Sequence, residues 1–322
     1  MLIRLGYEIR YRFLQPTPVL AMLDIHDSRR TDIVVATALQ TEPAIPLRGY
    51  RDQYGNSCTR MLAPAGVLTL RADAVVRDSG LPDQYRYDAP QTPVQELPED
   101  TLMYLLGSRY CETDLLSGMA WDLFGSAPTG WARVQAICDY VHAQIQFGYE
   151  HARPTKSAAQ ALQEGRGVCR DFAHSAIALC RCMNIPARYC TGYLGDIGVP
   201  ASAAPMDFSG WFEAFLDGQW YTFDARHNLP RIGRVLIARG RDAADVAISN
   251  TFGYNTLESF VVWTDETDQA RLDPRPVAAS GIGTGRRAAH RRALSLAWLG
   301  CSWGRSRERE SVASAGPQAI QA

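Results

Sequence analysis

The sequence predicts an α+β fold in which an all-β N-terminal domain precedes a core of helices packed on an antiparallel sheet. Residues 2–13 alternate strictly between apolar and polar side chains, as a half-buried strand does. Helical periodicity begins only after residue 98. The dipeptide Asp217-Gly218 lies between two apolar runs and is typical of a two-residue β-hairpin. With 322 residues, of which 46% are hydrophobic, the chain is long enough for two domains.

Five apolar runs predict the strands of the N-terminal domain. They are separated by turn-forming residues, and they cover residues 2–13, 19–25, 33–39, 58–62 and 67–76. We therefore expect an all-β domain over residues 1–88. The prolines of the next segment predict a linker over residues 89–98.

The core is predicted over residues 99–276. An i, i+3, i+4 apolar stripe predicts a helix over 131–145, a short helix follows the capping residue Ser157, and a third helix starts at Cys169. The strands expected after these helices cover residues 187–194, 211–216, 219–224, 234–237 and 257–264. Residues 277–322 are rich in Ala, Arg, Ser and Gly, which predicts a disordered tail.

Composition excludes several classes of function. The net charge of −1, with arginines scattered among acidic residues, argues against a nucleic-acid-binding protein. No apolar run approaches the roughly 20 residues that cross a bilayer. Charged residues interrupt the N-terminus, so it does not resemble a signal peptide, and we expect a cytoplasmic protein with no membrane partner. The eight cysteines lack zinc-ligand spacing, so we expect free thiols and neither a metal nor a cofactor.

Cys169 is the candidate nucleophile. It follows the glycine-containing turn 165–168 and begins a strongly helical segment. The unpaired N–H groups at a helix start favour the thiolate, so the position predicts a lowered thiol pKa. The backbone N–H of Cys169 would supply one donor of an oxyanion hole.

Four motifs give the sequence a family resemblance. They are Gly167-Val-Cys-Arg-Asp-Phe-Ala-His174, Asn184-Ile-Pro-Ala-Arg188, Trp211-Phe-Glu213 and Trp220-Tyr-Thr-Phe-Asp-Ala-Arg226. These motifs resemble those of the bacterial transglutaminase-like family, candidate cysteine proteases with a β-rich N-terminal domain and a papain-like, transglutaminase-like core. The resemblance covers nearly all of residues 1–265. It implies that Cys169 is the nucleophile, that Asp224 is the orienting carboxylate, and that a peptide or protein is the substrate.

The sequence departs from that family at Ser209, which stands where the family has its catalytic histidine, two residues before Trp211. A serine hydroxyl is too weakly basic to accept the thiol proton near neutral pH. Two hypotheses therefore stay open. The protein is a peptidase or amidase that forms an acyl-thioester at Cys169 with another base, or it is a catalytically impaired homologue that binds a peptide or protein. A third and weaker hypothesis is that the N-terminal domain is itself a partner-binding module.

Among the six histidines, His227 is the best substitute base, because it lies three residues beyond Asp224. A purely structural role for His227 stays open. His174 follows Cys169 by five residues, about 140° around the helix, so its ring should point away from the thiol. His151 lies in a polar loop that could line the cleft.

Two aromatic residues complete the predicted site. Tyr149 is a candidate second oxyanion donor, although such a tyrosine can also simply pack the approach loop. Trp211 is expected at the substrate cleft, and packing against the neighbouring strand is the alternative.

Overall fold

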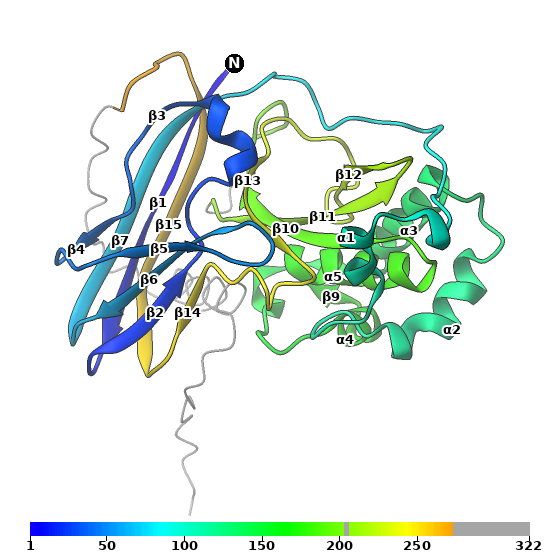
Figure 1. The fold of residues 1–322 in the computed structure, drawn as a ribbon, viewed down its shortest axis with the longest axis horizontal. Coiled ribbons are helices and arrows are strands. Elements are labelled where there is room, and N and C mark those ends of the chain that lie inside the picture. Colours follow the sequence, from blue (N-terminus) through cyan, green and yellow to red (C-terminus); the bar gives the residue numbers. More distant parts are fainter. Residues whose placement is uncertain (203–205, 273–322) are drawn as a thin grey trace, which may run out of the picture.

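The structure is a computed structural model that describes residues 1–202 and 206–272. A β-rich part and a helix-rich part lie side by side (Figure 1). The predicted tail over 277–322 lies outside the described residues.

Two antiparallel sheets form the β-rich part. The first has the strand order β15-β1-β7-β3, with β4 also paired to β7. The second has the order β14-β2-β6-β5. The strands of the first sheet are β1 (Leu2–Phe13), β3 (Ile33–Ala36), β4 (Gln40–Glu42), β7 (Gly66–Arg77) and β15 (Asn255–Thr267). Those of the second are β2 (Thr17–Ala21), β5 (Arg48–Arg51), β6 (Ser57–Ala63) and β14 (Ser249–Thr251).

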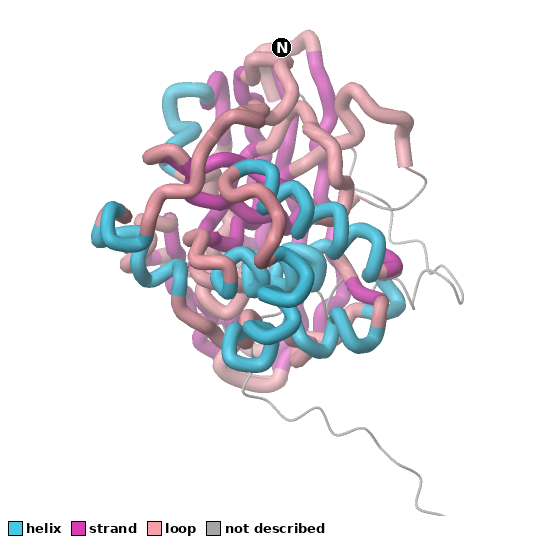
Figure 2. Tube along the Cα trace, turned by 90° about the vertical axis from the view of Figure 1, so that its right-hand side faces the viewer, coloured by secondary structure: helices cyan, strands magenta, loops and turns pink. Residues whose placement is uncertain are grey.

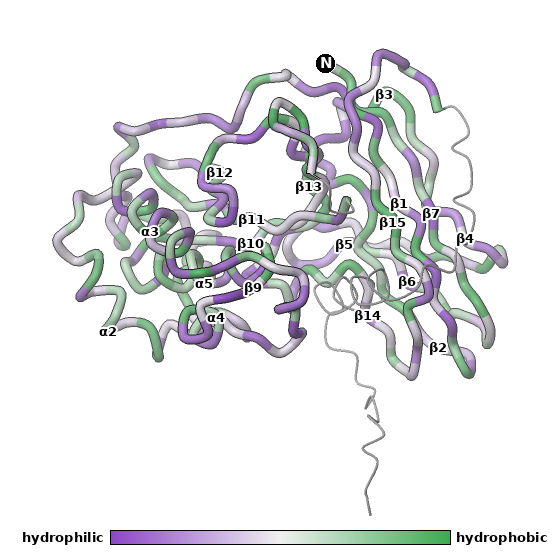
Figure 3. Tube along the Cα trace, turned by 180° about the vertical axis from the view of Figure 1, so that it is seen from behind, coloured by the Kyte–Doolittle hydropathy of each residue, from purple (hydrophilic) through white to green (hydrophobic). Residues whose placement is uncertain are grey.

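Strand β1 is the centre of this domain. Its alternating apolar side chains are buried, and it pairs with β7 without interruption from Leu2↔Arg77 to Phe13↔Gly66. Along β1 and β7, hydrophobic residues alternate with hydrophilic ones (Figure 3). The predicted half-buried strand over residues 2–13 is confirmed.

The C-terminal strands correct the predicted domain boundary. We expected the strand near residues 257–264 in the core, within 99–276. Instead β15 pairs with β1 along its whole length, and β14 pairs with β2. Alternation along a strand shows that one face is buried, but it does not show which sheet the strand joins. The N-terminal domain is therefore completed by residues more than 150 positions away in sequence, after the chain has passed through the core.

The core packs helices on a four-stranded antiparallel sheet of order β12-β11-β10-β13. These strands are β10 (Ala187–Tyr193), β11 (Ser209–Leu216), β12 (Gln219–Phe223) and β13 (Val235–Gly240). The central helix is α5 (Cys169–Cys182), which packs on β11 and against three other helices. These are α2 (Thr113–Phe124), α3 (Trp131–Gln144) and α4 (Ala158–Glu164). Figure 2 faces the helical side and shows these helices gathered together. Every residue of α5 is buried, so the helix holds Cys169 in a fixed position.

Short elements connect these layers. Helix α1 (Glu99–Leu102) follows the linker, and β8 (Gln146–Phe147) pairs in parallel with β9 (Arg166–Gly167). Four 3₁₀ helices lie at η1 (Asp27–Asp32), η2 (Val94–Glu96), η3 (Met103–Leu105) and η4 (Tyr149–His151). The segment 89–98 contains no strand and no α-helix.

Local sequence signals set several boundaries of the core. Ser157 and Gln160 form a capping box at the start of α4, and the helix stops at Gly165, whose φ of 64° is left-handed. Asp217 and Gly218 have φ values of 48° and 77°, as a type I′ hairpin turn requires. The predicted cap and hairpin are both confirmed. This turn places β12 beside β11. It also places Asp224, the residue after β12, at the edge of the candidate site.

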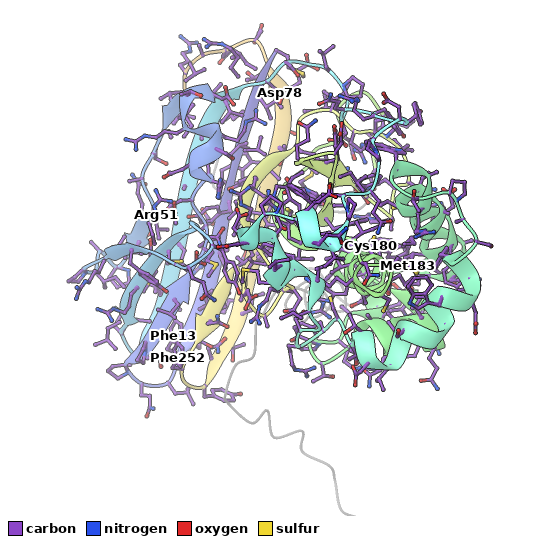
Figure 4. The ribbon with its side chains drawn as sticks, turned by 45° about the vertical axis from the view of Figure 1, so that its right-hand side comes forward. Phe13, Arg51, Asp78, Cys180, Met183 and Phe252 are labelled. Carbon is purple, nitrogen blue, oxygen red and sulfur yellow. The ribbon has the colours of Figure 1, made fainter. Side chains whose placement is uncertain are left out.

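Within the described part of the chain, no helix has the length and apolar character needed to cross a membrane. The same residues contain no group of three or more His, Cys, Asp or Glu side chains that could hold a metal ion. All seven cysteines that lie in the described ranges are free. Cys180 belongs to the packed interior and lies near Met183 at the end of α5 away from Cys169 (Figure 4).

The packing of β15 on β1 gives the first prediction. A Cβ added at Gly6 would lie 2.4 Å from the carbonyl oxygen of Ala72 and 2.6 Å from Cζ2 of Trp263, a residue of β15. We expect Gly6→Ala to destabilise the protein by about 1–3 kcal/mol through overpacking. At Gly49, also in a strand, the added Cβ meets only one oxygen, 4.0 Å away. Gly49→Ala should therefore be neutral or slightly stabilising. Urea unfolding of both variants measures this, and equal effects at the two sites would contradict the described packing.

Candidate active site

Cys169 is the first residue of α5 and is 3% exposed. The helix start is capped from within, because the carboxylate of Asp171 accepts the backbone N–H of Val168 at 3.0 Å. The thiol faces β11, since the backbone N–H of Gly210 donates a hydrogen bond to its sulfur. The structure thus brings the candidate nucleophile against the strand that begins with Ser209.

The pKa of Cys169 is raised, whereas its position at a helix start predicts a lowered pKa. Burial raises the thiol pKa to about 11, and the charge of Asp207 acts in the same direction. The guanidinium of Arg226 and the N–H of Gly210 lower it by less. The expected lowered pKa is wrong for the resting protein, because the helix start does not offset the loss of solvation. Cys169 rests as a thiol at neutral pH.

Ser209 opens β11 and pairs with Gly192 of β10. Ser209 is 4% exposed, and its Oγ has no hydrogen-bond partner among the described residues. A family histidine at this position would lie beside Gly210, the residue that contacts the sulfur of Cys169. Ser209 is therefore the residue before the one whose N–H contacts the sulfur.

Asp224 follows β12 directly, and its carboxylate is buried and saturated with donors. Oδ1 accepts the backbone N–H groups of Arg226 at 3.0 Å and His227 at 3.1 Å. Oδ2 accepts Nδ1 of His227 and Nη2 of Arg234, both at 2.8 Å. Burial alone would raise the pKa of Asp224, but Arg234 and His227 together hold it far below its ordinary value. The carboxylate is therefore ionised throughout the physiological range.

His227 is oriented by that carboxylate. Because an ionised carboxylate only accepts hydrogen bonds, Nδ1 of His227 donates to Asp224. With Nδ1 as the donor, Nε2 is the ring nitrogen that faces away from Asp224. An aspartate holds a histidine in the same way in catalytic triads, but here the histidine stands on the loop after β12 rather than on β11.

The base and the serine share one pocket of about 60 Å³. Its polar lining includes Tyr149, Asp207, Ser209, Arg226, His227 and Arg231. Cys169 is not itself a lining residue, but two residues of the lining, Asp207 and Arg226, both act on its thiol, so the thiol lies behind this lining. The structure thus brings the predicted Cys169, Ser209, Asp224 and His227 into one region.

Tyr149 also lines this pocket. Its hydroxyl forms a hydrogen bond with Arg226, and its pKa is raised by burial and by the charges of Asp207 and Cys169. The hydroxyl is therefore neutral and keeps its proton. Its electrostatic interaction with Cys169 places the hydroxyl near the sulfur.

Two residues predicted at the cleft are placed elsewhere. His151 does not line the pocket, and its Nε2 lies 3.6 Å from a carboxylate oxygen of Glu150. Trp211 is 3% exposed and is also absent from the pocket lining. The guanidinium of Arg234 lies 5.1 Å from the centre of the Trp211 ring, so Trp211 packs behind the site.

His174 has a structural role. Its Nε2 accepts the backbone N–H of Ala243 at 3.1 Å, and its ring stacks on Tyr110 with centroids 5.0 Å apart. Burial lowers the pKa of His174 well below its ordinary value. The ring stays neutral and faces away from the thiol, as its position on the helix predicts.

Sequence analysis missed three residues of the site. Arg226 is the last residue of the motif that contains Asp224, and it stacks over Phe147 at 3.7 Å, so its neighbourhood in sequence could have identified it. Asp207 and Arg234 gave no local signal. Asp207 comes from the loop before β11, and Arg234 directly precedes β13. Only the tertiary fold brings these two residues to the site.

Because four donors surround the carboxylate of Asp224, we expect Asp224→Asn to lower the free energy of unfolding by an amount that depends on pH. Removing one member of a buried ion pair typically costs about 3–5 kcal/mol, and we expect a loss of that order at pH 7. The folded-state pKa is lowered, so the stabilisation is present above the ordinary value of 3.8 and is lost as pH falls toward the folded-state pKa. The difference between wild type and variant should therefore shrink below about pH 4.

Chemical denaturation across pH measures this difference. The matched control is Asp217→Asn, which breaks an ion pair whose side chains are 37% and 41% exposed. It should cost less than about 1 kcal/mol. A constant difference down to pH 2 would argue against an ionised Asp224.

The charges around the thiol predict opposite effects of two substitutions. Asp207→Asn should lower the pKa of Cys169 and speed its alkylation by iodoacetamide, whereas Arg226→Gln should raise the pKa and slow alkylation. One pKa unit changes the thiolate population about tenfold. Peptide mass spectrometry measures the modification of Cys169 at pH 8 to 9, with Cys169→Ala as the blank. Changes of the same sign in both variants would contradict this electrostatic description.

Comparison with known proteins places this geometry in a family. The profile of the transglutaminase-like superfamily matches residues 119–225. The crystal structure of a candidate cysteine protease from Cytophaga hutchinsonii is 30% identical, with a TM-score of 0.73 over 85% of this chain and 93% of that one. An uncharacterized protein of Mycobacterium leprae is 26% identical over 240 residues, 68% of this chain and 81% of its own. The chain belongs to the bacterial transglutaminase-like family.

Proposed function

We propose that this protein is a cysteine hydrolase that attacks a peptide or glutamine-type amide through an acyl-thioester on Cys169. The observation that carries the proposal is the 2.8 Å contact between Nδ1 of His227 and Asp224, because His227 lines the pocket whose Asp207 and Arg226 act on that thiol. This pair supplies the base that Ser209 cannot supply. Similarity to the candidate protease of Cytophaga hutchinsonii supports the same class of chemistry.

The raised thiol pKa determines how the base is used. A resting thiolate is excluded at neutral pH, since burial raises the pKa of Cys169 to about 11. The proton must therefore leave the sulfur as the sulfur attacks the carbonyl carbon, as it does for a serine nucleophile. His227 takes up this proton, and the ionised Asp224 stabilises the imidazolium. The same proton then goes to the leaving amine, and water releases the acyl group.

We assign two donors to the developing oxyanion, the backbone N–H of Cys169 and the hydroxyl of Tyr149. As the first residue of α5, Cys169 has no carbonyl four residues earlier to bind its N–H within the helix. Tyr149 offers a neutral hydroxyl in the same pocket. Donors of this kind act by stabilising charge that appears only in the transition state.

A second candidate function is a non-catalytic protein that binds a peptide or protein partner in the same pocket. Two observations favour it, namely the serine at position 209 and the 3% exposure of Cys169. The oriented His227 favours the enzyme, because a binding pocket does not need an aspartate–histidine pair. Substitution of His227 distinguishes a hydrolase from a protein that only binds a partner.

His227 carries the central prediction. Acylation of Cys169 by p-nitrophenyl acetate should fall by about 10²–10⁴ in His227→Asn, the range that general-base catalysis contributes. Adding Ser209→His to that variant should restore part of the rate, since Asp224 is then free to orient a ring at the usual family position. Release of nitrophenolate measures the rate, and Cys169→Ala gives the background.

The control is His26→Asn, which changes a histidine in the other domain that caps a 3₁₀ helix through its side chain. Asparagine can also cap a helix start. If His227→Asn and His26→Asn acylate equally fast, the non-catalytic function is favoured. With peptide mixtures, new amino termini indicate peptide-bond cleavage, whereas ammonia release from glutamine peptides indicates attack on the side-chain amide.

A further inference from the structure

A second pocket lies where the β-rich part meets the core. It measures about 140 Å³. Strands β1, β3 and β7 and the loop after β2 form most of its wall, and Tyr193 at the end of β10 contributes from the core. No described residue lines both this pocket and the candidate active site. The two pockets are therefore separate sites.

The wall of this pocket is mostly apolar, but it includes the carboxylate of Asp24. The larger apolar side chains are Leu5, Leu23, Ile25 and Ile33. Among the described residues, the carboxylate of Asp24 accepts no hydrogen bond and forms no ion pair. Each water molecule in such a site needs about two to four polar partners, which apolar walls do not offer. The pocket therefore favours a ligand that is itself largely apolar.

Asp24 is the carboxylate of this pocket that lacks a cation. Asp73, the other carboxylate of the lining, forms an ion pair with Arg4. Burial raises the pKa of Asp24, and the charge of Arg51 lowers it by less. The guanidinium of Arg51 is itself paired with Asp27. A carboxylate that is partly removed from water and has no partner is costly, and a cationic ligand would remove that cost.

Two tyrosine hydroxyls lie near Asp24. Tyr193 lines the pocket and is 1% exposed. Tyr7 shares a face of the sheet with Ala72 of the lining, and its hydroxyl is buried without a hydrogen-bond partner among the described residues. Burial raises the pKa of both tyrosines, and the charge of Asp24 adds to the increase in each. A ligand with several donors on one atom can therefore bind Asp24 and the hydroxyl of Tyr193 together.

We propose that this pocket binds a small organic ammonium ion. The –NH₃⁺ group has three donors, which bind the carboxylate of Asp24 and the hydroxyl oxygen of Tyr193. The apolar body of the ligand lies against the leucines and isoleucines of the wall. A cavity of about 150 Å³ holds one benzene molecule, so the pocket admits a body of about that size. The inference does not depend on the proposed function.

A bare metal ion is the alternative cation. Calcium and magnesium are bound by about six or more oxygen ligands. In the described part of the chain, no group of three or more His, Cys, Asp or Glu side chains could hold a metal ion. The leucines and isoleucines of the wall supply no oxygen. The pocket therefore fits an organic cation better than a metal ion.

The test is isothermal titration calorimetry of the full-length protein at pH 7 with benzylamine and with benzyl alcohol, its uncharged analogue. Benzylamine should bind at one site per chain. It should bind at least about tenfold more tightly than benzyl alcohol, because hydrogen bonds between charged groups are stronger than neutral ones. Equal affinities would show that the ligand need not be a cation. Either that result or the absence of saturable benzylamine binding at millimolar concentrations would overturn the proposal.

Three substitutions in the pocket locate the bound amine. Asp24→Asn should weaken benzylamine binding at least about tenfold, since it removes one partner of a charge pair, and should affect benzyl alcohol far less. Tyr193→Phe should weaken benzylamine binding about two- to tenfold, the range of one hydrogen bond. Ala36→Leu changes an exposed position of β3 that lines the pocket. It should weaken the binding of both ligands, because the larger side chain takes up space.

The matched control is Asp207→Asn, which removes a carboxylate from the candidate active site instead. This variant should bind benzylamine as wild type does. If it loses as much affinity as Asp24→Asn, the amine occupies the other pocket and the proposal is wrong. The proposal is also wrong if Asp24→Asn binds benzylamine as tightly as wild type. Urea unfolding checks that each variant folds, and Asp24→Asn decides the outcome if Ala36→Leu does not.

Discussion

The buried carboxylate of Asp224 is the constraint on which the rest of the site depends. A charge without solvent must be paired and fully hydrogen-bonded, and here four donors surround it. Arg234 is in turn fixed by Asp83 at 2.8 Å, so the start of β13 and the segment before the linker are tied to the same point. The two N–H donors fold the chain back after β12 and place the His227 ring against the carboxylate. The position of the His227 ring therefore follows from the hydrogen bonds that one buried charge requires.

This arrangement accounts for a serine where the family has a histidine. An aspartate of this kind needs one imidazole to orient, and the loop after β12 supplies it. Once His227 occupies Oδ2 together with Arg234, a second ring on β11 has no free acceptor at that oxygen. A small side chain at position 209 leaves room for the pocket and avoids competition for the carboxylate.

The sequence predicted what depends on local periodicity, turns and caps. The β1 alternation, the Ser157 cap and the Asp217-Gly218 hairpin are visible in neighbouring residues, and each was found. The partner of β15 was not found, because alternation does not specify the sheet that a strand joins. His227 could be proposed from its spacing to Asp224, but its orientation depends on which atoms are buried there.

The prediction of a lowered pKa for Cys169 was also wrong because it used only neighbouring residues. A helix start acts on Cys169 through a few neighbouring N–H groups, which the sequence shows. Burial involves the whole surrounding core, which the sequence does not show, and burial is the larger effect here. A thiol that stays protonated cannot rely on a preformed thiolate–imidazolium pair, so its reactivity depends on how quickly a base removes the proton during attack. On the proposed mechanism, the rate therefore depends more on proton transfer from the sulfur to His227 than on the resting charge of the thiol.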